Sequence, residues 1–155
     1  MSSDDSYRHY VEEFALLFEQ SGLNRTAGRI LGWLHVAEPP HQTMPDLVEK
    51  LGASKSSIST ATRSLLQMGM IEKLSLPGER RDYYRMVDGV WTNALRDRNH
   101  EITLLRELAD RGLTLLADEP AERRQRLQEM RDMFAFFEQE FPRLFARWEE
   151  ERKEM

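Results

Sequence analysis

Residues 43–85 constrain the fold most, because they contain the signals for two short helices and a hairpin in unbroken succession. Thr43 and Asp46 have the spacing of a capping box, in which each side chain satisfies a backbone donor of the first helical turn. Gly52 permits a tight turn, and Ser54 is then placed to cap a second helix. This order predicts a helix-turn-helix followed by a β-hairpin wing.

The second helix is expected to run to about Met68 and to end at Gly69. Its apolar residues Ile58, Ala61, Leu65 and Leu66 recur at helical spacing and predict one buried face. The other side is expected to carry Lys55, Ser56, Ser57, Ser59, Thr60, Thr62 and Arg63.

Short hydroxyls and cations at the start of a helix suit close approach to a DNA major groove, where donors and acceptors meet base edges or phosphates. The alternative is that Ser and Thr merely cap and solvate a surface helix. Solvated helices are usually rich in Glu and Lys, whereas Ser and Thr are indifferent helix formers. We therefore predict DNA contacts for Ser54, Lys55, Ser56, Ser57, Ser59, Thr60 and Arg63.

The segments 70–76 and 82–87 alternate as strands do, and the Pro77-Gly78 pair between them has the composition of a hairpin turn. Arg80 and Arg81 then lie near an exposed loop tip, where a guanidinium can reach a minor groove or a phosphate. We expect Asp82 to hold one of these arginines in orientation. As an alternative, Arg–Asp pairs on exposed hairpins are common and contribute little.

Charge is unevenly distributed along a chain whose net charge is −5. Residues 53–87 contain 6 basic and 3 acidic side chains, whereas residues 1–52 contain 4 and 8, and residues 88–155 contain 12 and 16. The one basic segment therefore coincides with the expected reading helix and wing. A localised basic patch of this kind is compatible with nucleic-acid binding by an acidic protein.

Outside this module the chain is predicted to be helical, over about 10–19, 27–37, 88–117 and from after Pro120 to about Arg152. The fold class is thus mainly α: a winged helix-turn-helix with a small β-hairpin wing and long N- and C-terminal dimerisation helices. The expected domains are 1–22 with 88–155 for dimerisation and 23–87 for DNA binding.

The last predicted helix has a heptad-like apolar seam with spacings of 3 and 4 residues: Leu127, Met130, Phe134, Phe137, Phe141, Leu144 and Trp148. Packing within the chain is one explanation for such a seam. Two long helices attached to a small domain have little core of their own, however, so pairing with a second copy is the simpler explanation. Pro142 is expected to bend this helix.

Other functional classes have little support in the sequence. There is no apolar run long enough to span a bilayer and no signal peptide, which predicts a cytoplasmic protein without membrane insertion. The absence of cysteine excludes disulfides and thiol redox chemistry. The four histidines are scattered with no HExxH motif, phosphate loop or nucleophile elbow, so we expect no catalytic residue, no cofactor and no metal. A metal contact by His9 with Glu12 and Glu13, or by His100 with Glu101, is less favoured than a solvated helix face.

The run from Gly28 to Met86 resembles the GbsR-like branch of the MarR family of bacterial transcription regulators, and the whole chain resembles actinobacterial repressors of MmpS/MmpL-type efflux pumps. The most specific parts are Gly28 to Leu34 (GRILGWL), Ser57 to Ser59 (SIS) and Gly78 to Tyr84 (GERRDYY). The resemblance implies a dimeric repressor whose wing contains Arg80 and Arg81. Wings of this family usually have Asp, a spacer and Arg, whereas here Asp82 follows the arginines, which leaves open which arginine enters the minor groove.

The resemblance also implies a lipophilic effector, such as a fatty-acyl or glyceride-like molecule or a hydrophobic drug, held between the dimerisation helices and the DNA-binding part. Bulky apolar residues compatible with such a pocket are Phe14, Phe18, Trp33, Trp91, Leu105, Phe134 and Phe137. A stripe of this kind is more often plain core or dimer interface.

The residues and the resemblance together predict a dimeric regulator that binds double-stranded DNA with a (pseudo)palindromic operator. The resemblance adds that it represses an efflux or lipid transporter operon. The alternative is a winged-helix scaffold that binds protein without DNA. Replacing Lys55, Arg63, Arg80 and Arg81 distinguishes the two, because only DNA binding depends steeply on salt.

Overall fold

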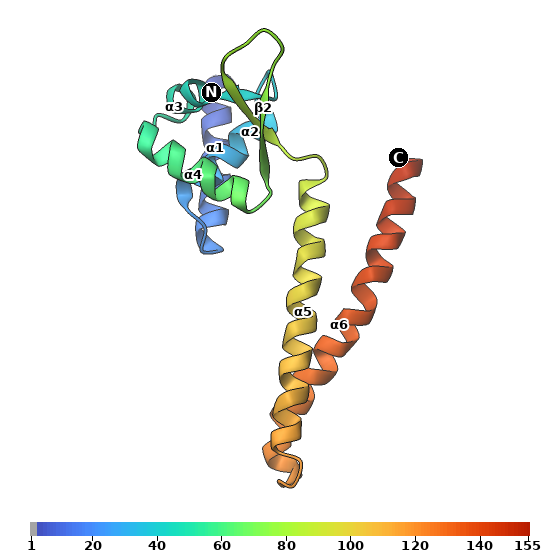
Figure 1. Cartoon of the computed structure of the whole chain (residues 1–155). Helices are drawn as coiled ribbons and strands as arrows, with labels where there is room; N and C mark the ends of the chain where they lie inside the picture. Colours follow the sequence, from blue (N-terminus) through green and yellow to red (C-terminus); the bar gives the residue numbers. More distant parts are fainter. Residues whose placement is uncertain (1–2) are drawn as a thin grey trace. The chain divides into compact units, whose positions relative to one another are not determined.

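The computed structural model describes residues 3–155, which form two compact units divided between Val90 and Trp91. The first unit contains the elements α1 (Ser3–Gln20), α2 (Arg25–Val36), β1 (Gln42–Thr43), α3 (Met44–Leu51), α4 (Lys55–Gln67), β2 (Ile71–Ser75) and β3 (Asp82–Met86) (Figure 1). The second contains α5 (Val90–Leu115), which begins at the last residue of the first unit, and α6 (Ala121–Glu154). The mainly helical class with a small hairpin wing is confirmed.

The sheet has three antiparallel strands in the order β1-β3-β2. The hairpin between β2 and β3 is confirmed, and its register pairs Leu74 with Tyr83 and Ser75 with Asp82. The sequence did not predict β1, because two residues are too few to show alternation. In this strand Thr43 pairs with Tyr83 on the other edge of β3.

The core of the first unit lies between α2, α3, α4 and the sheet. Its largest fully buried side chains are Ile30, Leu31, Leu47, Ile58, Leu65 and Ile71. All the helices from α2 to α4, together with β2, thus contribute to one core, so the reading helix predicted from the sequence is packed on a rigid support.

The caps predicted for α3 and for the start of α4 are confirmed. Thr43 caps α3, because its hydroxyl accepts from the Asp46 N–H at 3.2 Å while the Asp46 carboxylate accepts from the Thr43 N–H at 2.8 Å. Gly52 ends α3 with a φ of 59°, and Ser54 caps α4 by accepting from the Ser57 N–H at 3.1 Å. These caps set the short turn that places α4 after α3.

The first helix is longer than predicted, since α1 begins at Ser3 and not near Tyr10. Asp4 and Asp5 lie in its first turn, where carboxylates interact favourably with the helix dipole. Arg8 also pairs with Asp4 at 3.3 Å across one turn. The apolar stripe alone missed this exposed, polar start of the helix.

Two glycines let α1 pack closely on α2. A Cβ at Gly28 would lie 2.7 Å from the Ala15 Cα, and a Cβ at Gly32 would lie 2.9 Å from the Phe14 Cβ. Because one of these neighbours is backbone, a side chain at residue 28 would force the two helices apart. The GRILG motif is therefore required by helix packing.

Glu12 connects the same two helices by charge. Its carboxylate lies 2.6 Å from the Arg29 Nε and 3.0 Å from an Arg25 guanidinium nitrogen. Burial raises the pKa of Glu12, but the hydrogen bonds from Arg29 and Arg25 outweigh it and hold this pKa below its ordinary value of 4.5. The pKa of Asp46 is likewise below its ordinary value of 3.8, chiefly because it accepts hydrogen bonds from the Thr43 side chain and backbone.

The compact first unit contains α1 together with the winged helix, whereas the predicted domains join residues 1–22 to the C-terminal helices. Met1 and Ser2 of that predicted segment lie outside the described residues. A compact unit and a dimerisation region are different properties, so the dimerisation role of 1–22 and 88–155 stays a prediction.

The second unit has almost no core of its own. Between Trp91 and Met155, all of which the structure describes, Ala109 is the one buried apolar side chain. α6 remains helical through Pro142 and has no buried residue, and its seam is half-exposed or exposed throughout. The α5–α6 hairpin therefore leaves most of its apolar surface in solvent.

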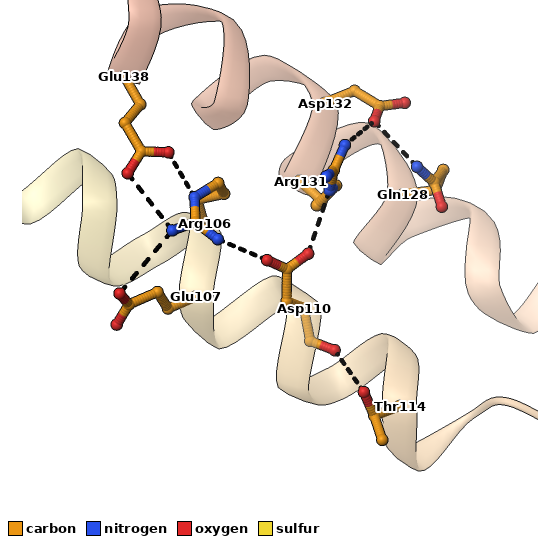
Figure 2. A network of polar contacts seen from close by, with 8 residues as sticks. All are labelled: Arg106, Glu107, Asp110, Thr114, Gln128, Arg131, Asp132 and Glu138. Carbon is orange, nitrogen blue, oxygen red and sulfur yellow. Dashed lines mark hydrogen bonds and ion pairs between the residues drawn. The ribbon is translucent and has the colours of Figure 1, made fainter.

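Charged side chains join α5 to α6 in place of a core (Figure 2). The Arg106 guanidinium donates to Glu138 of α6 and, at 2.6 Å, to Asp110 of its own helix. Asp110 also accepts from the Arg131 Nε at 3.1 Å. The hydrogen bond from Arg131, followed by that from Arg106, holds the pKa of Asp110 below its ordinary value, so this network is fully charged at neutral pH.

Among residues 3–155, no helix is both long and apolar enough to cross a membrane.

We expect Gly28→Ala to lower the free energy of unfolding by about 1–3 kcal/mol, because the new methyl group would collide with the α1 backbone. This cost is net of the roughly 1 kcal/mol by which alanine favours a helix over glycine. Gly112→Ala is the matched control, since the atoms nearest to its methyl group belong to the flexible side chain of Leu127 and not to backbone. Urea unfolding followed by circular dichroism measures both. Equal stability of the two variants would contradict the tight α1–α2 contact.

We also expect stability to be lost in acid. The pKa values of Glu12 and Asp46 are depressed in the folded chain, so their contribution is complete above the unfolded values and disappears as pH falls through the lower folded values. The melting temperature should therefore fall below about pH 4.5. Glu12→Gln and Asp46→Asn should flatten this decline, whereas Glu13→Gln, which removes an exposed carboxylate of α1, should not. Parallel acid profiles for all four proteins would rule out these two groups as its cause.

Candidate nucleic-acid interface

The outer face of α4 presents short polar side chains and two cations. Lys55, Ser56, Thr60 and Arg63 are exposed and Ser59 is half-buried, while Ile58, Ala61 and Leu65 face the core. Lys55 and Arg63 form no ion pair with any of residues 3–155. Both cations are thus available to an anionic partner.

Two of the predicted contact residues, Ser54 and Ser57, also form the N-terminal cap of α4. The Ser54 hydroxyl accepts from the Ser57 N–H and donates to the Ser57 Oγ at 2.9 Å. Ser57 keeps its own hydroxyl proton for an external acceptor. The first turn of α4 therefore carries exposed serine residues at a helix start, a place where phosphate binding is favourable.

The predicted position of one residue on this face is wrong. Thr62 is 2% exposed, and its hydroxyl donates to the Ile58 carbonyl at 2.9 Å and the Ser59 carbonyl at 3.0 Å. These bonds satisfy the hydroxyl inside the fold, so a polar residue occupies an inward position. Thr62 cannot contact DNA.

The wing carries Arg80 and Arg81 on an exposed loop between β2 and β3. The expectation that Asp82 orients one of them is wrong, because Asp82 lies 2.9 Å from the Lys73 Nζ. The register of the hairpin explains this: Ser75 pairs with Asp82 and Lys73 with Tyr84, which makes Lys73 a diagonal neighbour of Asp82. The pKa of Lys73 is raised, mainly by its hydrogen bond to Asp82.

Tyr83 provides a contact that the sequence did not predict. Its hydroxyl donates to the Glu79 Oε2 at 2.5 Å, and its ring meets the His41 ring edge-on at 5.1 Å. The hydrogen bond to Glu79 raises the pKa of Tyr83 above its ordinary value of 10.0, so the phenol is the donor of this bond. Only the hairpin geometry brings these two residues together, and no local sequence signal marks the pair.

The candidate effector residues fall in both units. In the first unit, Phe14 and Phe18 stack at 5.2 Å and pack against the core. Trp33 is half-buried, donates from its Nε1 to the Gln42 Oε1 at 3.1 Å, and lines a cavity of about 480 Å³ with Tyr7 and Lys50. The Lys50 Nζ lies 5.5 Å above the centre of the Trp33 ring. This cavity is lined by charged as well as apolar side chains.

In the second unit, Trp91 lines a largely apolar groove of about 370 Å³ with Leu95, Leu144 and Trp148. Phe137 lines another, of about 350 Å³, with Phe136 and Phe141. Leu105 is exposed and Phe134 half-buried. Trp33, Trp91 and Phe137 thus line three different cavities, and the effector role of the seven predicted residues stays a prediction.

No group of three or more His, Cys, Asp or Glu side chains within the described residues 3–155 has the geometry of a metal site.

Two family models match successive parts of the chain. Residues 21–82 match the MarR family, and residues 89–151 match MmpR5-like MarR family transcriptional regulators. The first match covers the winged helix from α2 to the start of β3, and the second covers α5 and nearly all of α6.

The relatives agree with these matches. The chain is 41% identical over 138 residues to the HTH-type transcriptional regulator MmpR5 of Mycobacterium tuberculosis, which covers 89% of this chain and 84% of that protein. It is 32% identical over 76 residues to the HTH-type transcriptional repressor OpcR of Bacillus subtilis, which covers 49% of this chain and 40% of that protein. A crystal structure of a transcriptional regulator shares 39% identity and a TM-score of 0.76, over 94% of this chain and 99% of that one.

The resemblance to the MarR family seen in the sequence is thus confirmed, and the match extends over both the winged helix and the C-terminal helices. These proteins are regulators of transcription and not enzymes. The chain belongs to the MarR family of transcriptional regulators.

Proposed function

We propose that this regulator is a cytoplasmic homodimer that represses an efflux or lipid transporter operon by binding a (pseudo)palindromic operator. The observation that carries the proposal is the set of exposed cations on α4 and the wing. Lys55, Arg63, Arg80 and Arg81 lie within one small domain, and none is ion-paired to another of the described residues. Exposed cations without an ion pair are suited to phosphates and base edges.

On this proposal the N-terminal half of α4 enters a major groove, with Ser54, Lys55, Ser56, Ser57, Ser59, Thr60 and Arg63 as its contact residues. The wing arginines approach the flanking backbone or the minor groove. Short side chains on α4 allow the helix backbone to come close to the bases, which favours direct readout. Long side chains at the same positions would hold it away.

Dimerisation is supported by the apolar surface of the second unit. Phe137, Leu144 and Trp148 of α6 are 42%, 53% and 43% exposed, and Leu104 and Leu108 of α5 are 49% and 51% exposed. Exposed apolar side chains in such number favour a helical partner. A twofold dimer also presents two reading helices to successive major grooves about 34 Å apart.

The regulated genes and the effector are supported by similarity alone. The sequence resembles repressors of MmpS/MmpL-type efflux pumps, and OpcR, one of the relatives, is a transcriptional repressor. A lipophilic effector would release the operator only by favouring a dimer whose reading helices no longer fit both grooves. Titrating the protein–operator complex with a fatty acid or monoglyceride tests this step, and an operator affinity unchanged at saturation would contradict it.

The DNA-binding face is tested by Arg63→Ala and Arg81→Ala. Each should weaken binding by roughly 1–3 kcal/mol per site, because each removes a charged contact with DNA. The measurement is fluorescence anisotropy with the intergenic duplex beside the gene, over several salt concentrations and against a scrambled duplex. Arg126→Ala removes an exposed arginine of α6 and is the matched control, expected to leave the affinity unchanged. If the wild type binds the intergenic duplex no more tightly than the scrambled duplex, the result favours the alternative function, a scaffold that binds protein without DNA.

The dimer is tested by Leu144→Glu. A carboxylate buried without a partner in each copy should raise the dimer dissociation constant by roughly a hundredfold or more. Ala146→Glu introduces the same charge at an exposed residue of α6 outside the seam, and should leave the dimer intact. Sedimentation equilibrium distinguishes the two. A monomeric wild-type protein, or dissociation of both variants alike, would contradict pairing through this seam.

A further inference from the structure

The two wing arginines are enclosed in the sequence by two acids. Glu79 precedes Arg80, and Asp82 follows Arg81. Neighbouring carboxylates of this kind can pair with the guanidiniums and offset their charge. In the structure both acids are held by other side chains: Glu79 accepts from the Tyr83 hydroxyl at 2.5 Å, and Asp82 lies 2.9 Å from the Lys73 Nζ.

The fold holds both partners in place. Tyr83 is in the central strand, between Thr43 of β1 and Leu74 of β2, and the His41 ring packs edge-on against its ring. A backbone hydrogen bond of 3.1 Å from the Glu79 N–H to the Leu76 carbonyl forms a turn just before the two arginines. The phenol therefore meets the carboxylate in a defined geometry.

Lys73 has an equivalent position on the other strand of the hairpin. It pairs with Tyr84 in the ladder, so its side chain reaches Asp82 diagonally across the sheet. Neither Arg80 nor Arg81 forms an ion pair with any other residue that the structure describes. In the wing, the two carboxylates are thus bound to other side chains, and the two guanidiniums between them in the sequence are left without an ion pair.

We propose that Tyr83 and Lys73 are positioning residues that keep Glu79 and Asp82 away from Arg80 and Arg81, so that both guanidiniums remain available to DNA phosphates. The inference rests on the proposed DNA-binding function. Loss of the Tyr83 hydroxyl frees the Glu79 carboxylate, which then pairs with an adjacent arginine. Each arginine so paired releases no counterion from DNA, so both the affinity and its salt dependence decrease.

A third carboxylate, Asp46 of α3, also interacts electrostatically with Arg81. The hydrogen bonds from Thr43 lower the pKa of Asp46 most, and the positive charge of Arg81 lowers it further. The Asp46 carboxylate acts as a cap through its Oδ2, which accepts from the Thr43 backbone at 2.8 Å and from its hydroxyl at 2.7 Å. Asp46 is therefore held to Thr43, which leaves Glu79 and Asp82 as the acids that can change partner.

The first test needs no DNA. Phenylglyoxal reacts with free guanidiniums more readily than with those held in ion pairs, and peptide mass spectrometry reports the rate at Arg80 and Arg81. Tyr83→Phe should slow this rate by about three- to fivefold, the effect of one ordinary hydrogen bond. The double variant Tyr83→Phe with Glu79→Gln should restore it, because the freed acid is gone. An equal rate in the wild type and Tyr83→Phe would overturn the proposal.

The second test uses the intergenic duplex at several salt concentrations. Tyr83→Phe should weaken binding by about fivefold per half-site, and the slope of log K against log salt should fall by about 1 per half-site. Glu79→Gln keeps an acceptor for Tyr83 and should bind at least as tightly as the wild type. The double variant should recover both affinity and slope. A purely structural role for Tyr83 predicts no such rescue, so a double variant as weak as Tyr83→Phe would overturn the proposal.

Lys73→Gln removes the partner of the other carboxylate, Asp82, and should also weaken DNA binding. Adding Asp82→Asn should restore the affinity, as Glu79→Gln does for Tyr83→Phe. Glu72→Gln is the control for the loss of one negative charge, since Glu72 lies on the same hairpin but pairs with Arg85 at 2.6 Å. It should not rescue Tyr83→Phe. If the wild type binds no DNA at all, the proposed function fails, and the labelling rates still decide whether Tyr83 keeps the arginines free.

Discussion

The burial of one face of α4 determines which of its side chains reach solvent. Ile58, Ala61 and Leu65 fix the rotation of this helix in the core that it shares with α2 and β2. A change of one residue in this rotation, about 100°, would bury Arg63 and expose an apolar side chain. The helix cannot rotate without losing this burial. Packing of the apolar face therefore determines which side chains of α4 are exposed, and the exposed short residues are not needed for the core.

Local chemistry was enough to predict the caps of α3, the start of α4 and the hairpin. The Thr43–Asp46 box, the Gly52 turn and the Ser54 cap each depend on residues within one or two turns, and the structure contains all three. The predictions that failed depend on packing and on strand register. Thr62 is polar but lies inward, because its hydroxyl finds carbonyls of its own helix, and Asp82 binds Lys73 because of a strand register that the sequence does not specify.

The two units reach stability by different means. The first buries Ile30, Leu31, Leu47 and Leu65 in a continuous core, whereas the second joins its helices by ion pairs such as Arg106 with Glu138 and Arg96 with Glu149. These pairs are between a quarter and a half exposed, and solvated pairs contribute little free energy. The α5–α6 hairpin therefore has specific geometry but weak cohesion. Covering its apolar surface with a second copy would stabilise it more than these ion pairs do, which links the folding of this unit to the proposed dimer.

The wing is also connected to α2 by a route that does not pass through α4. The Trp33 Nε1 donates to the Gln42 Oε1, and the Gln42 Nε2 donates to the Pro39 carbonyl at 2.8 Å, which fixes β1 against the end of α2. Gln42 in turn pairs with Tyr84 in β3. A molecule that displaced Trp33 from its place beside the 480 Å³ cavity would break a hydrogen bond to the sheet while the core contacts of α4 remained intact. Allosteric coupling is typically worth only about 1–3 kcal/mol, close to the contribution of one or two such bonds. On the proposed function, regulation of DNA affinity through the position of the wing would therefore require less disruption of the fold than regulation through movement of α4.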